Sequence, residues 1–297
     1  MMNLKRFVVL LSLSACAALG QAQQPLPSQQ QDGIKVKPLS AWRNLQSEQQ
    51  VDQAARSQYA ALLGQAREKG VLVSASDAQV IRLRAIARYL IPHTPRWNPA
   101  AANWKWEVNL LDSPQVNAFC MPGGRIAFYS GILNTLTLTD DEVAVVMGHE
   151  IAHALREHGR ERAAKANVTS LGARLAGAGL AAWLGIDPRL TGVVPDQAAQ
   201  LAVLRFSRDE ETEADLSGLD VAARAGFDPR AGVALWQKMG ALNKRTPPAW
   251  LSTHPSGDNR IAEINRNMGL LLPVYARSKG VDQARLPPYR TTSLAKR

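Results

Sequence analysis

Two histidines and one glutamate near the middle of the chain have the spacing of a zinc site. They lie in the stretch His149-Glu150-Ile151-Ala152-His153, which reads H-E-x-x-H. On a helix, residues four apart project from one face, so both imidazoles can reach a single Zn²⁺. The carboxylate of Glu150 can then face the water bound to that metal and act as a general base. This spacing predicts a zinc peptidase.

The residues before this stretch predict the helix that must carry it. Thr139 and Glu142 form a T-x-x-E capping box, and acidic residues fill the first turn, where the helix dipole favours negative charge. Apolar residues then recur at helical spacing as far as Leu155. We therefore expect one helix from residue 140 to about residue 158, with both histidines beside its apolar face.

A catalytic zinc site needs a third protein ligand and leaves one position for water. The pattern H-E-x-x-H-x-x-G-x-x-H would supply a third histidine, but here Arg156 and Gly159 stand at its last two fixed positions. His158 is one residue out of place. We expect it to be a solvated polar residue near the helix end, where a protonated ring suits the dipole.

A later acidic segment offers a glutamate as the third ligand. Residues 207–215 read S-R-D-E-E-T-E-A-D, and we expect them on a second helix from residue 197 to about 225. Glu211 could bind the metal, while Asp215, four residues on, accepts a hydrogen bond from a ligand histidine. Ala214 is small enough to let the two helices approach. The other acidic residues are expected at the surface, namely Asp209, Glu210 and Glu213. A fully solvated acidic helix is the alternative.

Four blocks of sequence together resemble one zinc metallopeptidase family. H-E-I-A-H and the acidic block resemble the family of HtpX, the CAAX prenyl proteases and the periplasmic BepA and LoiP proteases. Residues 117–126 are similar to its N-A-F-x-x-P-G-G-x-I segment, and residues 253–261 to its T-H-P-x-x-x-x-R-I segment. The soluble BepA- and LoiP-like type fits best, because the other types carry several membrane spans.

This resemblance implies a fold and a function. The fold is α+β and mostly helical, a gluzincin-type domain with a small β-sheet beside the H-E-x-x-H helix. One Zn²⁺ per chain is expected. The resemblance implies an exported endopeptidase that hydrolyses unfolded, misfolded or misassembled envelope proteins.

Three short segments are typical of strands, and they would form the sheet. They cover residues 104–111, 115–120 and 125–129, with a Pro-Gly-Gly turn between the last two. An edge strand beside the metal helix could hold an extended substrate by main-chain hydrogen bonds. We expect this of Asn117, Ala118 and Phe119, with an ordinary core hairpin as the alternative.

His254 and Arg260 are further candidates, with several roles open. His254 could stabilise the oxyanion of the reaction or cap the following helix. By the resemblance to BepA-like proteins, it could instead be a fourth ligand that closes the site. Arg260 could bind the oxyanion or a substrate carbonyl. A chaperone-like binding module, held closed by His254, is therefore the alternative to an enzyme. Glu150 favours the enzyme, because a structural zinc needs no base.

The ends of the chain predict export and anchoring. Residues 1–22 read as a secretory signal with a basic start and an apolar stretch too short to cross a bilayer. Residues 13–16 also resemble a lipobox, in which Cys16 would be lipidated; cleavage after Ala22 is the alternative. We expect a periplasmic protein, anchored to the outer membrane as a lipoprotein.

The remaining organisation follows from composition. Residues 23–39 are rich in Gln, Pro and Ser and read as a flexible linker. We expect a metallopeptidase domain over residues 40–275 and a poorly ordered basic tail over residues 276–297. Within the domain, residues 168–194 read as a helical hairpin or lid. The net charge of +10 suits a membrane surface. No nucleic-acid partner is expected, since the chain has no binding motif for one.

Overall fold

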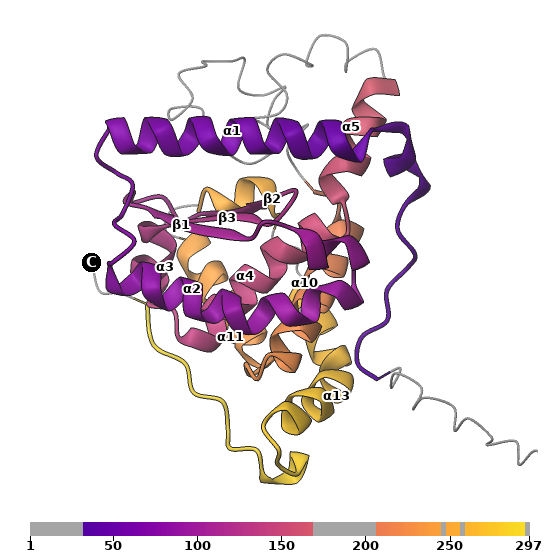
Figure 1. The fold of residues 1–297 in the computed structure, drawn as a ribbon. Helices are drawn as coiled ribbons and strands as arrows, with labels where there is room; N and C mark the ends of the chain where they lie inside the picture. Colours follow the sequence, from indigo (N-terminus) through magenta and orange to yellow (C-terminus); the bar gives the residue numbers. More distant parts are fainter. Residues whose placement is uncertain (1–31, 169–205, 245–247, 256–258, 295–297) are drawn as a thin grey trace, which may run out of the picture. The chain divides into compact units, whose positions relative to one another are not determined.

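The computed structural model describes residues 32–168, 206–244, 248–255 and 259–294. These residues form helices around one three-stranded sheet (Figure 1). The α+β, mostly helical fold expected from the sequence is confirmed. The expected signal, residues 1–22, lies outside the described residues. The expected hairpin or lid, residues 168–194, also lies outside them, except for its first residue.

The sheet has three strands, and the last of them in the sequence lies at its centre. Its strands are β1 (Glu107–Leu111), β2 (Ala118–Met121) and β3 (Arg125–Tyr129), in the order β1-β3-β2. β1 runs parallel to β3, and β2 runs antiparallel to it. Gly123 and Gly124 turn the chain between β2 and β3 with φ values of +78° and +85°, which side chains disfavour. Because the strand order is β1-β3-β2, β2 pairs with β3 alone and is an edge strand.

Helices cover both faces of the sheet (Figure 1). Helix α1 (Glu48–Glu68) packs on one face, and helices α2 (Ala78–Leu90) and α4 (Asp140–Leu155) pack on the other. Because side chains alternate along a strand, Phe119 of β2 joins the cluster with α1, and Ala118 joins the cluster with α4. Because helices cover both faces of the sheet, side chains on both sides of β2 and β3 are mostly buried, and both strands have nearly continuous apolar sequences.

Two capped helices form the centre of the domain. Helix α4 begins at the expected Thr139–Glu142 capping box, and α10 (Arg208–Arg224) begins at a second box, made by Ser207 and Glu210. A single helix from residue 197 is therefore wrong, because Ser207 is extended and stops it. Helix α2 likewise begins after a capping residue, Asp77, whose side chain accepts from the Gln79 amide.

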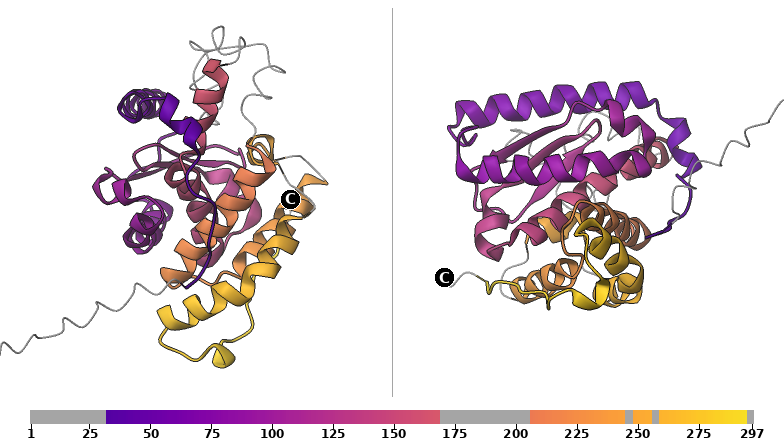
Figure 2. Two further views of the ribbon diagram at one scale, coloured as in Figure 1. Left: turned by 90° about the vertical axis from the view of Figure 1, so that its right-hand side faces the viewer. Right: turned by 60° about the horizontal axis from the view of Figure 1, so that its bottom comes forward.

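The other helices surround this pair. Helix α13 packs against α10 and α11 (Figure 2). The helices not yet given are α3 (Ser130–Leu136), α5 (His158–Val168), α11 (Ala231–Asn243), α12 (Trp250–Thr253) and α13 (Arg260–Ser278), with the 3₁₀ helices η1 (Ala41–Leu45), η2 (Ile91–Arg96), η3 (Pro99–Asn103) and η4 (Gln283–Arg285). Among the described helices, none has an apolar stretch long enough to cross a membrane.

Both ends of the described chain bind to this helical core. Asp32 pairs with Arg224 at 3.1 Å, and the amide of Ile34 lies 3.3 Å from the buried Asp220. At the other end, Thr292 accepts a hydrogen bond from Lys238, which also pairs with Glu142 of α4 at 2.7 Å. The composition of these segments predicts a flexible linker and a poorly ordered tail. The described parts of both make specific side-chain contacts.

Helices α4 and α10 meet at a pair of glycines. A Cβ atom built on Gly148 would lie 2.7 Å from the Gly218 carbonyl oxygen, and one built on Gly218 would lie 2.7 Å from the Gly148 backbone. Real Cβ atoms do not approach backbone atoms so closely, so only glycine fits at both positions. The sequence singled out Ala214 for this role. Ala214 is buried between the helices, but the two glycines make the backbone contact.

We expect Gly218→Ala to lower the free energy of unfolding by about 1–3 kcal/mol. The added methyl group would overlap backbone atoms of α4, which can move only if the two helices separate. Urea denaturation measures the change. Gly240→Ala in α11 is the matched control, because a Cβ there meets no atom within 4 Å. It should stabilise the helix by up to about 1 kcal/mol. Equal effects of the two changes would contradict the packing argument.

Candidate metal centre

Four buried side chains from three parts of the chain meet between α4 and α10. His149 and His153 come from α4, Glu211 comes from the first turn of α10, and His254 follows α12. Each offers one ligand atom, and these atoms all lie within 4.8 Å of one another. The structure thus brings together the three expected ligands and places His254 directly beside them.

The spacing of these atoms suits a tetrahedral ion. His149 Nε2 lies 3.1 Å from both His153 Nε2 and His254 Nδ1, and 3.7 Å from Glu211 Oε2. Glu211 Oε1 lies 3.5 Å from His153 Nε2 and 3.0 Å from His254 Nδ1. Zinc bonds of about 2.0–2.1 Å require tetrahedral edges of about 3.3 Å. The separations that involve the three ring nitrogens and Glu211 Oε1, 3.0–3.5 Å, lie around that value.

The protonation of the cluster also suits a cation. His149 Nδ1 donates to Asp215 Oδ1 at 3.0 Å, which directs Nε2 of the same ring into the cluster. Burial lowers the pKa of His153 well below its ordinary value, against the opposing effect of Glu211, and this favours the neutral ring. Nitrogen lone pairs and a carboxylate crowded in the interior are the donors that a buried Zn²⁺ needs.

Arg260 neutralises the carboxylates behind the cluster. Its guanidinium donates two hydrogen bonds of 2.6 Å to Asp215 and a further bond to Glu211. It also stacks on the Trp236 ring, with 3.6 Å between the guanidinium carbon and the ring centroid. Burial would raise the pKa of Asp215, but Arg260 and the His149 hydrogen bond hold it below its usual value. All three guanidinium nitrogens thus donate to protein carboxylates.

Glu150 lies beside the cluster and is held by a tryptophan. The indole Nε1 of Trp250 donates to Glu150 Oε1 at 2.6 Å, and both side chains are buried. Trp250 itself stacks on Trp236, with 5.3 Å between ring centroids. His254 Nε2 lies 3.6 Å from the same Glu150 oxygen. No motif in the sequence indicates Trp250, although it lies four residues before His254.

His254 does not cap the helix that follows it. The N-cap of α13 is Asn259, without a side-chain cap bond, and the His254 ring faces the cluster instead. Burial would lower the pKa of His254, but the carboxylates of Glu150 and Glu211 raise it above its ordinary value. The two roles that remain from the sequence are the oxyanion contact and the fourth ligand.

The expectation of a solvated His158 is wrong. Helix α4 ends at Leu155, and Glu157 adopts a left-handed conformation with φ +56°, so His158 starts a new helix and its ring turns back toward the site. His158 is 2% exposed, and its Nδ1 lies 3.0 Å from His153 Nδ1. Glu213, expected at the surface, lies 3.2 Å from His158 Nε2. Periodicity could not locate the break, because the acidic and basic residues around it suit a helix.

The proposed substrate residues lie on or next to β2. The side chain of Asn117 accepts a hydrogen bond from the Ala118 amide at 3.0 Å. Ala118 packs toward α4, whereas the ring of Phe119 lies against Tyr59 of α1 in the other cluster. Of these three residues, the Phe119 side chain therefore faces away from the metal centre.

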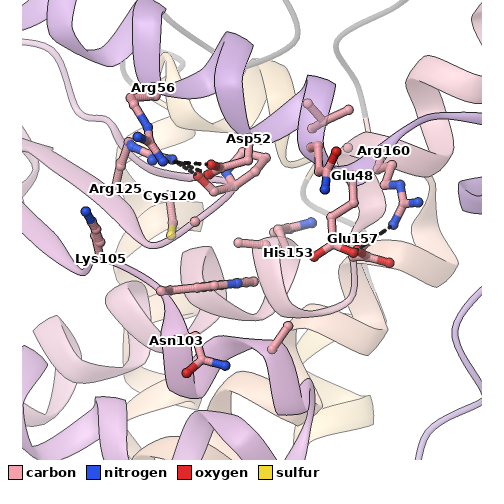
Figure 3. Close-up of a pocket in the computed structure, with 18 residues that line it drawn as sticks. Glu48, Asp52, Arg56, Asn103, Lys105, Cys120, Arg125, His153, Glu157 and Arg160 are labelled. Atoms are coloured by element: carbon pink, nitrogen blue, oxygen red, sulfur yellow. Dashed lines mark hydrogen bonds and ion pairs between the residues drawn. The ribbon is translucent and has the colours of Figure 1, made fainter.

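A cavity of about 470 Å³ adjoins His153 and runs beside β2 to the start of α1 (Figure 3). The Cys120 side chain, on the edge strand, lines it. Its upper wall holds Asp52, which pairs with Arg125 at 2.8 Å and with Arg56 at 3.2 Å. The cavity thus connects His153, one of the four cluster residues, with Cys120 of the edge strand.

Comparison with known proteins identifies the family. The sequence profile described as "Peptidase family M48" matches residues 82–268, more than half of the chain. The chain belongs to this family. The resemblance expected from the sequence is therefore confirmed.

Several curated proteins share this region. The mitochondrial metalloendopeptidase OMA1 of Bos taurus is 33% identical over 208 residues, 67% of this chain and 39% of that protein. The Arabidopsis thaliana mitochondrial metalloendopeptidase OMA1 is 39% identical over 161 residues, 52% of this chain and 30% of its own length. The beta-barrel assembly-enhancing protease of Escherichia coli is 29% identical over 183 residues, 57% of this chain and 36% of that protein. The chain thus spans less than half the length of these relatives.

Proposed function

We propose that this protein is a zinc-dependent endopeptidase, with His149, His153 and Glu211 as ligands of one Zn²⁺ and Glu150 as the general base. The observation that carries the proposal is the buried cluster, whose ligand atoms lie within 4.8 Å of one another beside an acid that is not itself a ligand. A structural zinc site has no need of such an acid. Membership of a metallopeptidase family supports the same conclusion.

In the proposed reaction, Glu150 handles the proton and the residues around it position the reacting groups. A bound Zn²⁺ would acidify a water molecule and polarise the scissile carbonyl. Glu150 takes the proton of the attacking water and delivers it to the leaving amine. Trp250 orients the Glu150 carboxylate, and Asp215 fixes the ring of His149. We assign Arg260 to holding Asp215 and Glu211, because its donors already face them.

The edge strand is the proposed binding site for the peptide backbone. The Tyr129 amide donates to the Asn117 carbonyl, so these two residues form a hydrogen-bonded pair of the β2–β3 ladder. In an antiparallel ladder such pairs alternate, so Phe119 also bonds to β3. Cys120 then directs its backbone N–H and carbonyl outward, where an extended substrate can pair with them. At Ala118 the carbonyl also points outward, while the amide already donates to the Asn117 side chain.

The substrate class and location extend this proposal. We propose that the protein is exported to the periplasm, anchored through a lipidated Cys16 at the outer membrane, and acts on unfolded or misassembled envelope proteins. The signal-like start of the sequence and a relative named as a beta-barrel assembly-enhancing protease support this location. The relatives named as mitochondrial belong to a different compartment, and their names support the peptidase activity alone.

A closed form of the site is the second candidate, favoured by one observation. His254 Nδ1 lies 3.1 Å from His149 Nε2 and 3.0 Å from Glu211 Oε1, at least as close as the expected ligand atoms lie to one another. A nitrogen in this position would fill the place of the water. The protein would then bind polypeptides without cleaving them until His254 moves away.

We expect Glu150→Gln to lower kcat for an unfolded protein such as casein by about 10²–10⁴-fold, because an amide cannot accept the proton. Zinc content, measured by atomic absorption, should stay at about one ion per chain, since Glu150 is no ligand. Removing the metal with a chelator should abolish cleavage by the unaltered protein, and adding Zn²⁺ should restore it. Full activity of Glu150→Gln would contradict the mechanism.

We expect Cys120→Pro to raise KM for casein by tenfold or more with zinc content unchanged. Proline removes an outward N–H group from β2, and the ladder to β3 does not use that group. Cys120→Ala is the matched control, because it removes the thiol and keeps the backbone donor. If both variants bind casein as the unaltered protein does, β2 is not the substrate strand.

We expect His254→Ala to raise the rate of casein cleavage severalfold, because it frees the fourth position of the metal site. Initial rates at saturating casein measure the change, with zinc content determined in parallel. A fall in kcat at full zinc occupancy would instead assign His254 to the oxyanion.

A further inference from the structure

Behind His153, the buried His158 and the partly buried Glu213 form a chain of contacts that the proposed mechanism has not used. His153 Nδ1 lies 3.0 Å from His158 Nδ1, and His158 Nε2 lies 3.2 Å from Glu213 Oε2. Arg156 holds the other oxygen of Glu213 with bonds of 2.7 Å and 2.5 Å. His158 belongs to α5 and Glu213 to α10, so the chain joins three helices at the back of one ligand.

The hydrogens of this chain follow from its acceptors. Both Nε and the second terminal nitrogen of Arg156 lie within 2.7 Å of one Glu213 oxygen, and this ion pair keeps Glu213 as a carboxylate. A carboxylate only accepts, so the neighbouring His158 Nε2 must carry a hydrogen. A neutral His158 then has a lone pair at Nδ1. The contact between the two Nδ1 atoms needs one hydrogen, which must therefore lie on His153.

The reverse arrangement would defeat metal binding. If His158 carried its hydrogen on Nδ1, its Nε2 lone pair would face the Glu213 carboxylate at 3.2 Å. His153 would then have to accept at Nδ1 and carry its own hydrogen on Nε2, directed into the cluster and toward Glu211 Oε1 at 3.5 Å. A protonated Nε2 cannot bind a metal ion.

Other contacts hold His153, His158 and Glu213 in this arrangement. Phe206 stacks on the His153 ring with 3.8 Å between centroids, so the ring is held on its face as well as at its edge. Arg156 also donates to the Lys37 carbonyl at 2.5 Å, which ties the end of the chain to the described start of the protein. The left-handed Glu157 lets Arg156 and His158 approach Glu213 from the end of α4 and the start of α5.

We propose that His158 and Glu213 are positioning residues that fix His153 in the tautomer with its hydrogen on Nδ1, so that Nε2 is free for the metal. This inference rests on the proposed metal site. The two ligand histidines then have different hydrogen-bond partners at Nδ1. His149 donates directly to a carboxylate, whereas a neutral imidazole separates His153 from its carboxylate. Partners of this kind change metal affinity by about 10–100-fold when they are lost.

The test measures zinc affinity by competition with a chromophoric chelator. His158→Phe keeps the ring and removes both nitrogens, and we expect the zinc dissociation constant to rise by about 10–100-fold. His158→Asn is the rescue variant, because its side-chain oxygen can replace Nδ1 as the acceptor. It should recover most of the affinity. Asp209→Asn, a change at an exposed residue of the same acidic segment, should leave the affinity unchanged.

A second pair of variants covers a failure of His158→Phe to fold. Glu213→Ala leaves His158 in place but removes the acceptor that fixes its tautomer, so zinc affinity should fall. Glu213→Gln retains an acceptor oxygen and should lose less. The visible absorption of the Co²⁺-loaded protein should change in Glu213→Ala and stay closer to that of the unaltered protein in Glu213→Gln.

The outcomes separate this inference from the proposed function. Absence of zinc from the unaltered protein would overturn both. Normal zinc binding by the unaltered protein, together with equal affinity in His158→Phe and Glu213→Ala, would overturn the positioning role and leave the peptidase proposal intact. Equally weak binding by His158→Phe and His158→Asn, with both variants folded, would show that packing and not the acceptor is what His153 requires.

Discussion

The backbone contact between Gly148 and Gly218 sets the distance on which the candidate site depends. His149 directly follows one glycine, while Glu211 and Asp215 lie within two turns before the other on the facing helix. The ring nitrogens of His149 can reach carboxylate oxygens of Asp215 and Glu211 at 3.0 and 3.7 Å only because the two helix backbones touch. Even one additional methyl group between the helices would exceed the space there. The metal site is therefore a property of helix packing as much as of its ligands.

Charge balance is the second constraint, and it explains the residues around the ligands. Glu150, Glu211 and Asp215 are three buried acids within one small region. Isolated buried carboxylates are strongly unfavourable, so each needs a charge or donor close by. Arg260 serves Asp215 and Glu211, and the Trp250 indole serves Glu150. A divalent cation in the cluster would supply the remaining positive charge, so metal binding and stability of the folded domain would be linked.

The sequence predicted those features that depend on local spacing. His149, His153, Glu211 and Asp215 each lie at a fixed offset on a capped helix, so a helical pattern was enough to place them on two faces. It could not place His158 or Trp250, because their positions depend on chain breaks and on the return of distant segments. The left-handed Glu157 turns His158 inward, and the hydrogen bond from the Trp250 amide to the Val116 carbonyl places the indole over Glu150. Neither contact has a periodic signal in the sequence.

Helix α12 links the edge strand, the general base and the fourth donor in one short element. It has four residues, begins with Trp250 and ends one residue before His254. Its first amide bonds to the Val116 carbonyl, just before β2, and the Thr253 carbonyl accepts from Phe206, which covers His153. In the proposed closed form, moving His254 out of the cluster would strain both bonds. It would also shift the indole that holds Glu150. Opening of the site, release of the base and access to β2 would then be one coupled change, because one element of four residues carries all three contacts.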